Sequence, residues 1–449
     1  MDDLILKVKE LIANKSFKEF REHCDELNEA DMASLLEELP TNELLTFFRI
    51  LPKSYAADVF AYLPIDLQQQ MILSFSLGEA AGIIEELDVD DATDLMDEMP
   101  ANVVTRLLSN TSLETRNIIN QLLKYPDSSA GSLMTTEYES LKINLTVSQA
   151  VNKIRKDGPE KETINICYVL DPQRKLLGIV TLKDLLFADP EQLIGDIMTE
   201  QVVSVNTLDD QEDVARDFQK YDFTAMPVVD SENRLVGIIT VDDIVDILQE
   251  EATEDIEKMA AISPSDLPYS KTGVFETWKK RIPWLLLLMI SATFTGMIIK
   301  KYEDALGAYI VLTTFIPMIM DTGGNAGSQA SVSIIRALSL DELEFSDIFK
   351  TLWKEIRVSL LVGVTLAATN FVKLLLIDGV SVTVALVVCL TLVATVFVAK
   401  VVGSSLPLIA KRIGFDPAVM ASPFITTIVD ALSLIIYFRF AVLLLGITV

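Results

Sequence analysis

Residues 275–449 contain five long stretches that are almost free of charged side chains. These stretches cover residues 282–299, 305–335, 358–377, 379–399 and 417–438. A helix needs about 20 consecutive apolar residues to cross the hydrocarbon core of a bilayer. The sequence therefore predicts an all-α membrane domain over residues 276–449 with five transmembrane helices.

The rest of the chain is strongly acidic. Residues 275–449 carry 14 basic and 12 acidic side chains, so the net charge of −28 leaves −30 for residues 1–274. Such a surface repels phosphate backbones, which argues against a nucleic-acid partner and makes cations the first class of ligand to consider. The three cysteines lie far apart and there is one histidine, so we expect no disulfide framework, zinc site or histidine-based catalysis.

The basic residues predict how the chain is oriented. They precede the first stretch and recur between the second and third and between the fourth and fifth, which makes those loops cytoplasmic. The N-terminus lacks a signal-peptide pattern. We therefore expect a multi-pass protein of the plasma or inner membrane, with a cytoplasmic N-terminal half and an external C-terminus. An odd number of helices leaves no obvious inverted repeat, which favours a pathway at a homodimer axis.

Residues 30–100 repeat one pattern at multiples of twelve residues. The marks are Leu39-Pro40, Leu51-Pro52, Leu63-Pro64, Leu87-Asp88 and Met99-Pro100, with Phe75-Ser76 at the remaining step. Apolar residues between the marks have helical spacing, which predicts an all-α helical-repeat domain over residues 1–129. Its acidic residues belong mostly to solvated faces. Asp90, Asp91 and Asp94 form a denser group that could share a divalent cation with a facing acidic surface.

Residues 130–245 contain a duplication. The first motif occurs as Gly131-Ser-Leu-Met-Thr135 and again as Gly195-Asp-Ile-Met-Thr199. The second occurs as Gly178-Ile-Val-Thr-Leu-Lys-Asp184 and again as Gly237-Ile-Ile-Thr-Val-Asp-Asp243. The pattern predicts an α/β arrangement and resembles a tandem pair of cystathionine-β-synthase-type (CBS) domains. The resemblance implies a regulatory module that often binds adenosyl ligands, with Thr240, Asp243, Thr181 and Asp184 at the nucleotide. The alternative is that these residues only cap the helices that follow them.

A helix is expected to begin near Val241. Its later part and the hinge that follows form an acidic connecting segment over residues 246–275. The hinge is marked by Pro264 and Pro268. Like charges one helical turn apart destabilise a helix, so the acidic run needs an explanation. Either the helix is a solvated connector, or cations bridge it to the acidic N-terminal domain. The candidate cation ligands outside the N-terminal domain are Asp222, Asp243, Asp246, Glu250, Glu251, Glu254 and Asp255.

Two features of the membrane domain predict an ion pathway. Asp430 lies near the middle of the fifth stretch, one turn after Thr426, and carboxylates at membrane depth are functional candidates by default. The alternative is a structural pair with Lys373, Lys400 or Arg439. The segment 322–329, which contains Asn325 and three glycines, would loosen its helix or let backbones pack closely. It matches no phosphate-binding glycine motif.

Taken together, these segments resemble the MgtE family of magnesium channels. The specific elements are Asp31-Met-Ala-Ser-Leu-Leu-Glu-Glu-Leu-Pro40, the two CBS motifs, Pro317 to Gln329, Asp416-Pro-Ala-Val and Pro423 to Asp430. The resemblance implies a homodimer with a pore between the subunits, lined by the second and fifth helices. It places Asp430 at the position for ion selectivity and Asp416 at the cytoplasmic mouth. No family role is carried onto Asp321.

The resulting hypothesis is a magnesium channel or transporter, not an enzyme, that closes when cytosolic Mg²⁺ binds between its acidic cytosolic domains. Mg²⁺ dehydrates reluctantly, so a pore should recognise the hydrated ion. ATP is a further expected ligand. One alternative is a transporter of another divalent cation regulated by adenine nucleotide. A membrane enzyme is less favoured, because no nucleophile and base occur together in the sequence.

Overall fold

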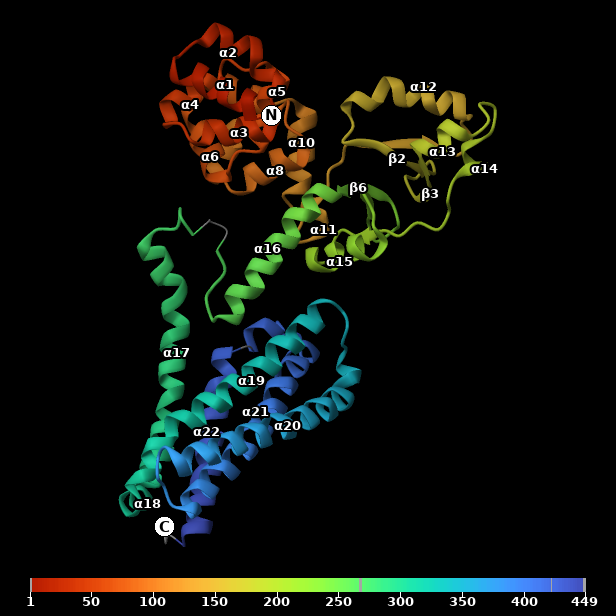
Figure 1. The fold of residues 1–449 in the computed structure, drawn as a ribbon. Helices are drawn as coiled ribbons and strands as arrows, with labels where there is room; N and C mark the ends of the chain where they lie inside the picture. The colour runs from red at the N-terminus through yellow and green to blue at the C-terminus, as the bar shows by residue number, and fades with distance from the viewer. Residues whose placement is uncertain (1, 266–268, 421, 447–449) are drawn as a thin grey trace. The chain divides into compact units, whose positions relative to one another are not determined.

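A computed structural model describes residues 2–265, 269–420 and 422–446, and Pro268 of the predicted hinge lies outside them. The chain divides into two compact units, residues 1–248 and 249–449. Figure 1 shows the helices and strands of both units.

The first unit begins with a run of short helices. Their bounds are α1 Asp2–Ala13, α2 Phe17–His23, η1 Cys24–Glu26, α3 Glu29–Glu37, α4 Thr41–Phe48, α5 Lys53–Ala61, α6 Ile65–Ser74, α7 Leu77–Ile84, α8 Val89–Asp97, α9 Ala101–Leu108 and α10 Leu113–Leu122. From α3 to α10, each helix begins twelve residues after the previous one. The helical repeat predicted from the punctuation is confirmed.

The punctuating residues are the N-caps of these helices. Pro40, Pro52, Pro64 and Pro100 stand immediately before α4, α5, α6 and α9 in an extended conformation. Proline cannot continue a preceding helix, because it lacks the backbone N–H and its ring clashes with the previous turn. Ser76 fills the remaining step with a capping box, in which its side chain accepts from the Glu79 backbone N–H.

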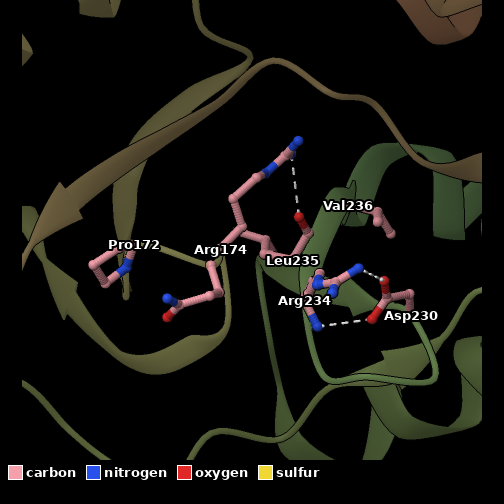
Figure 2. A pocket seen from close by; sticks show the side chains of 7 residues that line it. Pro172, Arg174, Asp230, Arg234, Leu235 and Val236 are labelled. Atoms are coloured by element: carbon pink, nitrogen blue, oxygen red, sulfur yellow. Dashed lines mark hydrogen bonds and ion pairs between the residues drawn. The ribbon is translucent and has the colours of Figure 1, made fainter.

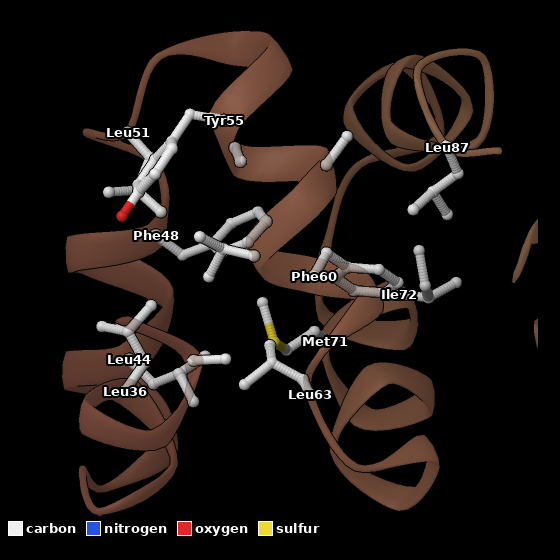
Figure 3. Close-up of a cluster of buried hydrophobic side chains, with 14 of the residues drawn as sticks. Leu36, Leu44, Phe48, Leu51, Tyr55, Phe60, Leu63, Met71, Ile72 and Leu87 are labelled. Atoms are coloured by element: carbon white, nitrogen blue, oxygen red, sulfur yellow. The ribbon is translucent and has the colours of Figure 1, made fainter. Parts of the chain in front are cut away.

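The repeats pack around one apolar core. Leu36, Leu44, Phe60 and Met71 come from four different helices and are fully buried. Figure 3 shows these side chains pointing toward one another between the helices. Burying a large apolar side chain contributes roughly 1.5–3 kcal/mol, and no single repeat could bury its apolar face alone.

Two related α/β units complete the first compact unit. The first consists of α11 Ala130–Leu133, β1 Tyr138–Lys142, α12 Val147–Asp157, η2 Gly158–Glu160, β2 Thr163–Leu170, β3 Leu176–Thr181 and α13 Leu182–Phe187. The second consists of α14 Ile194–Ile197, β4 Val205–Asn206, α15 Gln211–Tyr221, β5 Ala225–Val229, β6 Leu235–Thr240 and the start of α16 Val241–Met259. In each, the first strand pairs parallel to the second and the second antiparallel to the third.

The second compact unit is helical. It contains the end of α16, then α17 Val274–Lys301, α18 Glu303–Ala308, η3 Ile310–Phe315, α19 Ile316–Ser339, η4 Phe345–Asp347, α20 Ile348–Leu376, α21 Val382–Arg412, η5 Pro417–Met420 and α22 Ser422–Leu445. Four segments of the described chain are long and apolar enough to cross a membrane, and they contain α17, α20, α21 and α22. The second predicted span corresponds to α18, η3 and α19, and α19 is not among the four.

The glycine-rich segment does not interrupt α19. The helix continues through residues 322–329, so of the two expected effects only close backbone packing occurs. A Cβ at Gly324 would lie 2.9 Å from Thr426 Cγ2 of α22, and one at Gly403 of α21 would collide with the Gly327 carbonyl. The glycines are therefore required because α21 and α22 pack directly against the backbone of α19.

Candidate functional site

Three carboxylates of the first unit meet at a possible metal site. Asp88 is the N-cap of α8, Glu137 directly precedes β1, and Glu162 directly precedes β2. One carboxylate oxygen from each lies within 4.8 Å of the other two. The Asp88 and Glu137 carboxyl groups are also close enough to share a hydrogen bond. Carboxylate oxygens are the ligands that Mg²⁺ and Ca²⁺ prefer.

The surrounding charges are almost all negative. Burial raises the pKa of Glu137 and of Glu162 to about 7, and the neighbouring Asp88 carboxylate adds to both shifts. The pKa of Asp91 is also raised to about 7, first by burial and then by Asp88 and Asp243. A group of carboxylates that resists ionisation is one that a cation would stabilise.

Some of the predicted sensor residues adjoin these three carboxylates. Asp91 on α8 interacts electrostatically with Asp88, and Asp90 on the same helix interacts with Glu162. Both also interact with Asp243 near the start of α16. Burial is the largest cause of the raised pKa of Asp90, which lies well above its usual range, and of Asp243, which is about 6. Asp94 also lies on α8, whereas Asp222 ends α15 in a left-handed conformation with φ 54°.

The residues proposed for nucleotide binding have the same geometry in both α/β units. Thr181 Oγ1 donates to Asp184 Oδ2 at 2.6 Å, and Thr240 Oγ1 donates to Asp243 Oδ2 at 2.9 Å. Thr181 and Asp184 also form a capping box at the start of α13. The capping role considered from the sequence is therefore present at this pair.

A separate pocket of about 400 Å³ lies between the β2–β3 and β5–β6 hairpin turns. Figure 2 shows Arg174 and Arg234 lining it. Arg174 Nη2 donates to the Leu235 carbonyl at 3.3 Å, and Arg234 pairs with Asp230. Both guanidinium groups are thus already engaged, and the pocket contains neither of the Thr–Asp pairs.

In the second unit, Asp430 has no counter-ion among the described residues. Lys373 pairs with Asp378 at 2.8 Å, and Lys400 pairs with Glu355 at 3.5 Å. These contacts contradict the alternative in which Lys373 or Lys400 neutralises Asp430. Thr426 Oγ1 donates to the Pro423 carbonyl at 3.0 Å, which orients this turn of α22.

One face of α19 carries exposed polar side chains. Asp321, Asn325 and Gln329 follow one another at intervals of four residues and are exposed on this chain. Residues four apart lie on the same face of a helix. A polar stripe cannot face lipid cheaply, so it faces either water or another protein surface.

The C-terminal end of α16 contacts the segment before η5. Lys258 Nζ lies 2.8 Å from Asp416 Oδ2 and 2.6 Å from Glu254 Oε1. Burial alone would lower the pKa of Lys258, but the bonds to Asp416 and Glu254 outweigh it and raise the pKa. Asp255 accepts a hydrogen bond from Ser339 Oγ at 3.2 Å, and Met259 packs with Ile335 and Ala418.

Comparison with known proteins identifies the family. The model of the divalent cation transporter MgtE matches residues 316–440, and that of the MgtE intracellular N domain matches residues 27–128. The CBS domain model matches twice, over residues 130–191 and 194–250. The magnesium transporter MgtE of Thermus thermophilus is 37% identical over 99% of both chains, and that of Bacillus subtilis is 33% identical over 98% of this chain and 97% of its own.

The chain belongs to the MgtE family.

Two crystal structures resemble the first unit of this MgtE-family chain. The soluble part of a magnesium transporter is 34% identical, with a TM-score of 0.53, and covers 56% of this chain and 99% of its own. The cytosolic domain of the Mg²⁺ channel MgtE in complex with ATP is 36% identical, with a TM-score of 0.52, and covers 54% and 99%. The expected order of helical-repeat domain, paired CBS domains and helical membrane region is confirmed.

Sequence reasoning about this MgtE-family chain missed four contact residues. Glu137 and Glu162 join the acidic cluster, while Lys258 and Ser339 bind the predicted residues Asp416 and Asp255. Glu137 and Glu162 are single acids that each directly precede a strand. No spacing rule links them to Asp88, because their proximity arises only when the α/β unit packs against α8.

Proposed function

We propose that this chain conducts Mg²⁺ across the plasma or inner membrane and closes when cytosolic Mg²⁺ binds its acidic first unit. The central observation is Asp430, a carboxylate within an apolar helix that has no counter-ion in the described part of the second unit. An uncompensated charge at this depth is costly unless it serves a permeating cation. The names of the relatives favour magnesium over another divalent cation.

The pathway requires a second copy of the chain. The polar stripe of Asp321, Asn325 and Gln329 is exposed on a single subunit, so a homodimer that faces two stripes together would enclose a polar path. Two Asp430 carboxylates would then accept hydrogen bonds from the water shell of Mg²⁺, with Thr426 and Asn325 beside them. Asp416 forms the cytoplasmic mouth of this path.

The sensor consists of two groups of carboxylates. In the first unit, Asp90, Asp91 and Asp94 act with Asp243, with Asp88 and with the newly found Glu137 and Glu162. Asp222, Asp246, Glu250, Glu251, Glu254 and Asp255 are the remaining proposed ligands. Without Mg²⁺, repulsion within these groups favours an open arrangement, and bound ions favour a compact closed one. Several weak sites together can shift such an equilibrium by the sum of their differential affinities.

ATP is the proposed ligand of the CBS pair. A relative of the first unit was crystallised with ATP, and this chain has equivalent Thr–Asp pairs in both repeats. Thr240 and Thr181 would lie near phosphate, and Asp243 and Asp184 would bind ribose. Because Asp243 also belongs to the acidic cluster, nucleotide and Mg²⁺ would influence the same helix end.

We assign the proposed roles to four segments. Residues 1–129 form the acidic repeat domain, 130–245 the CBS pair, 246–275 the connecting helix and hinge, and 276–449 the membrane domain. The N-terminal half is cytoplasmic and the C-terminus external, as the distribution of basic residues predicts.

The test is Mg²⁺ current through reconstituted protein while the Mg²⁺ concentration on the cytosolic side is varied. Wild type should close as that concentration rises, and Asp430→Asn should change ion selectivity. Neutralising Asp243, Asp246, Glu251 and Glu254 should preserve conduction and weaken inhibition by Mg²⁺. Unchanged inhibition in this variant would contradict the sensor, and current indifferent to Asp430→Asn would contradict the pore assignment.

A further inference from the structure

Helix α20 begins with exposed aromatic and basic side chains. Phe349 is 83% exposed and Trp353 is 61% exposed, and Lys354 and Arg357 are also exposed. Phe349, Trp353 and Arg357 follow one another at intervals of four residues, and residues four apart lie on the same face of a helix. Two aromatic rings therefore share one surface with positive charge, and exposed apolar patches that adjoin polar groups mark interaction sites.

The length of α20 explains where this surface lies. The helix has 29 residues and is about 44 Å long, whereas the hydrocarbon core of a bilayer is about 30 Å thick. Residues 358–372 carry no charge, so they are the part that crosses the hydrocarbon. Residues 348–357 precede them and extend into the headgroup region, on the cytoplasmic side in the proposed topology. Tryptophan is enriched at that level of a bilayer.

Arg357 is held against Trp353. Its guanidinium carbon lies 5.9 Å from the centroid of the Trp353 ring, and its Nε donates to the Trp353 carbonyl at 3.3 Å. The side chain thus extends toward the N-terminal end of α20, away from the apolar stretch. In the described part of the chain, its two terminal nitrogens donate no hydrogen bond. A guanidinium group oriented in this way can donate two parallel hydrogen bonds to a phosphate.

The positive charges of this surface are not neutralised by the protein. Among the described residues, neither Lys354 nor Arg357 forms an ion pair with a carboxylate. Glu355 is the only acid in residues 348–357, and it pairs with Lys400 of α21 at 3.5 Å, with both side chains largely buried. Two unpaired positive charges one helical turn apart repel each other, so an anion that binds both of them is stabilising.

Helix α17 begins with the same kinds of side chain. Phe275 is 86% exposed and Trp278 is 59% exposed, and Lys279 and Arg281 are exposed beside them. Neither of these two basic residues forms an ion pair within the described chain. They directly precede the uncharged stretch 282–299, just as the basic residues of α20 precede its uncharged stretch. Two helices far apart in the sequence therefore present the same chemistry at the same level of the bilayer.

We propose that the first turns of α20 and α17 bind the headgroups of anionic phospholipids, with Lys354 and Arg357 as the phosphate ligands on α20. This inference rests on the membrane placement in the proposed function and adds a lipid partner to it. A soluble phosphate would use the charges alone. The exposed rings, and the apolar face that continues at Leu361, which is 73% exposed, match a ligand whose phosphate is attached to acyl chains.

The test uses quenching of Trp353 fluorescence by brominated lipid. The chain has three tryptophans, and a full-length variant with Trp278→Phe and Trp284→Phe keeps Trp353 alone. This variant is reconstituted in phosphatidylcholine vesicles that contain brominated phosphatidylglycerol or brominated phosphatidylcholine. It should prefer phosphatidylglycerol by about 25-fold, because each basic side chain near the surface contributes about fivefold. Lys354→Gln and Arg357→Gln should each lower that preference about fivefold.

The matched control is Lys350→Gln, which removes a lysine of the same helix that already pairs with Asp347 at 4.0 Å, and it should leave the preference within about twofold. Glycerol phosphate added to the buffer should not reduce quenching. Reduced quenching would show that the site takes a soluble phosphate instead, which would overturn the lipid assignment.

Equal quenching by the two brominated lipids would also overturn the proposal. Mg²⁺ uptake measured in the same vesicles separates this result from the proposed function, because uptake without lipid preference leaves the proposed function standing, and absent uptake contradicts it. If neither substitution at Lys354 or Arg357 folds, NaCl provides the measurement. The preference of the folded protein should fall several-fold between 0.1 and 1 M NaCl as the charges are screened, and an unchanged preference would contradict the site.

Discussion

Mg²⁺ binding to the acidic cluster of the first unit should release protons. In the absence of metal, the pKa values of Asp91, Glu137 and Glu162 are each about 7, chiefly because burial disfavours the charged form. A metal ligand must be deprotonated, so an ion that binds these oxygens displaces whatever protons they hold. The number of protons released therefore reports directly on the cluster.

The magnitude follows from the three pKa values. At pH 7 each of these three groups is half protonated, so full occupancy by Mg²⁺ releases about 1.5 protons per chain from them. At pH 8 each holds about a tenth of a proton, and the release falls to about 0.3. Because the three pKa values are raised, the metal-free folded cluster is most stable at low pH, where its carboxyl groups are protonated. It loses that stability as the pH rises through about 7 and the groups ionise. Bound Mg²⁺ then takes the place of the protons.

The assay is calorimetric titration of the purified full chain with Mg²⁺ in two buffers of equal pH and different ionisation enthalpy. The control variant carries Glu137→Gln and Glu162→Gln, and its release at pH 7 should be lower by about one proton. Equal release by wild type and this variant would show that Mg²⁺ does not bind these carboxylates. Release that does not fall between pH 7 and pH 8 would refute the assigned pKa values.

Three further predictions concern other parts of the chain. Lys258→Met removes the cation that joins Glu254 and Asp416. If this ion pair holds the closed state, the variant should need a higher cytosolic Mg²⁺ concentration to close. An unchanged closing concentration in current recordings would show that the ion pair does not hold the closed state. Gly403→Ala should lower stability in detergent by about 1–3 kcal/mol, because its Cβ collides with the Gly327 backbone, whereas Gly296→Ala meets nothing within 4 Å and should melt like wild type. Thr240→Val should weaken ATP binding in equilibrium dialysis, and equal affinity would leave Thr240 with a structural role only.

Much of the architecture was determined by sequence patterns that act locally. A proline or a capping residue every twelve positions stops one helix and starts the next wherever the helices later pack, so the repeat domain was readable without a structure. The duplicated Gly-to-Asp motif similarly predicted two related α/β units. Long apolar stretches predicted spans because the thickness of a bilayer sets a length requirement on each helix by itself.

The tertiary structure decided which distant side chains meet. The glycines of α19 were compatible with either a loosened helix or close packing, and only the neighbouring α21 and α22 determined that the helix continues. The same contacts place Gly324 of α19 against Thr426 of α22, although these residues are 102 positions apart in the sequence. Asp88, Glu137 and Glu162 likewise come from separate elements. Periodicity specifies which face of a helix is polar, but the register between two elements depends on how all their side chains pack, and that information is not local.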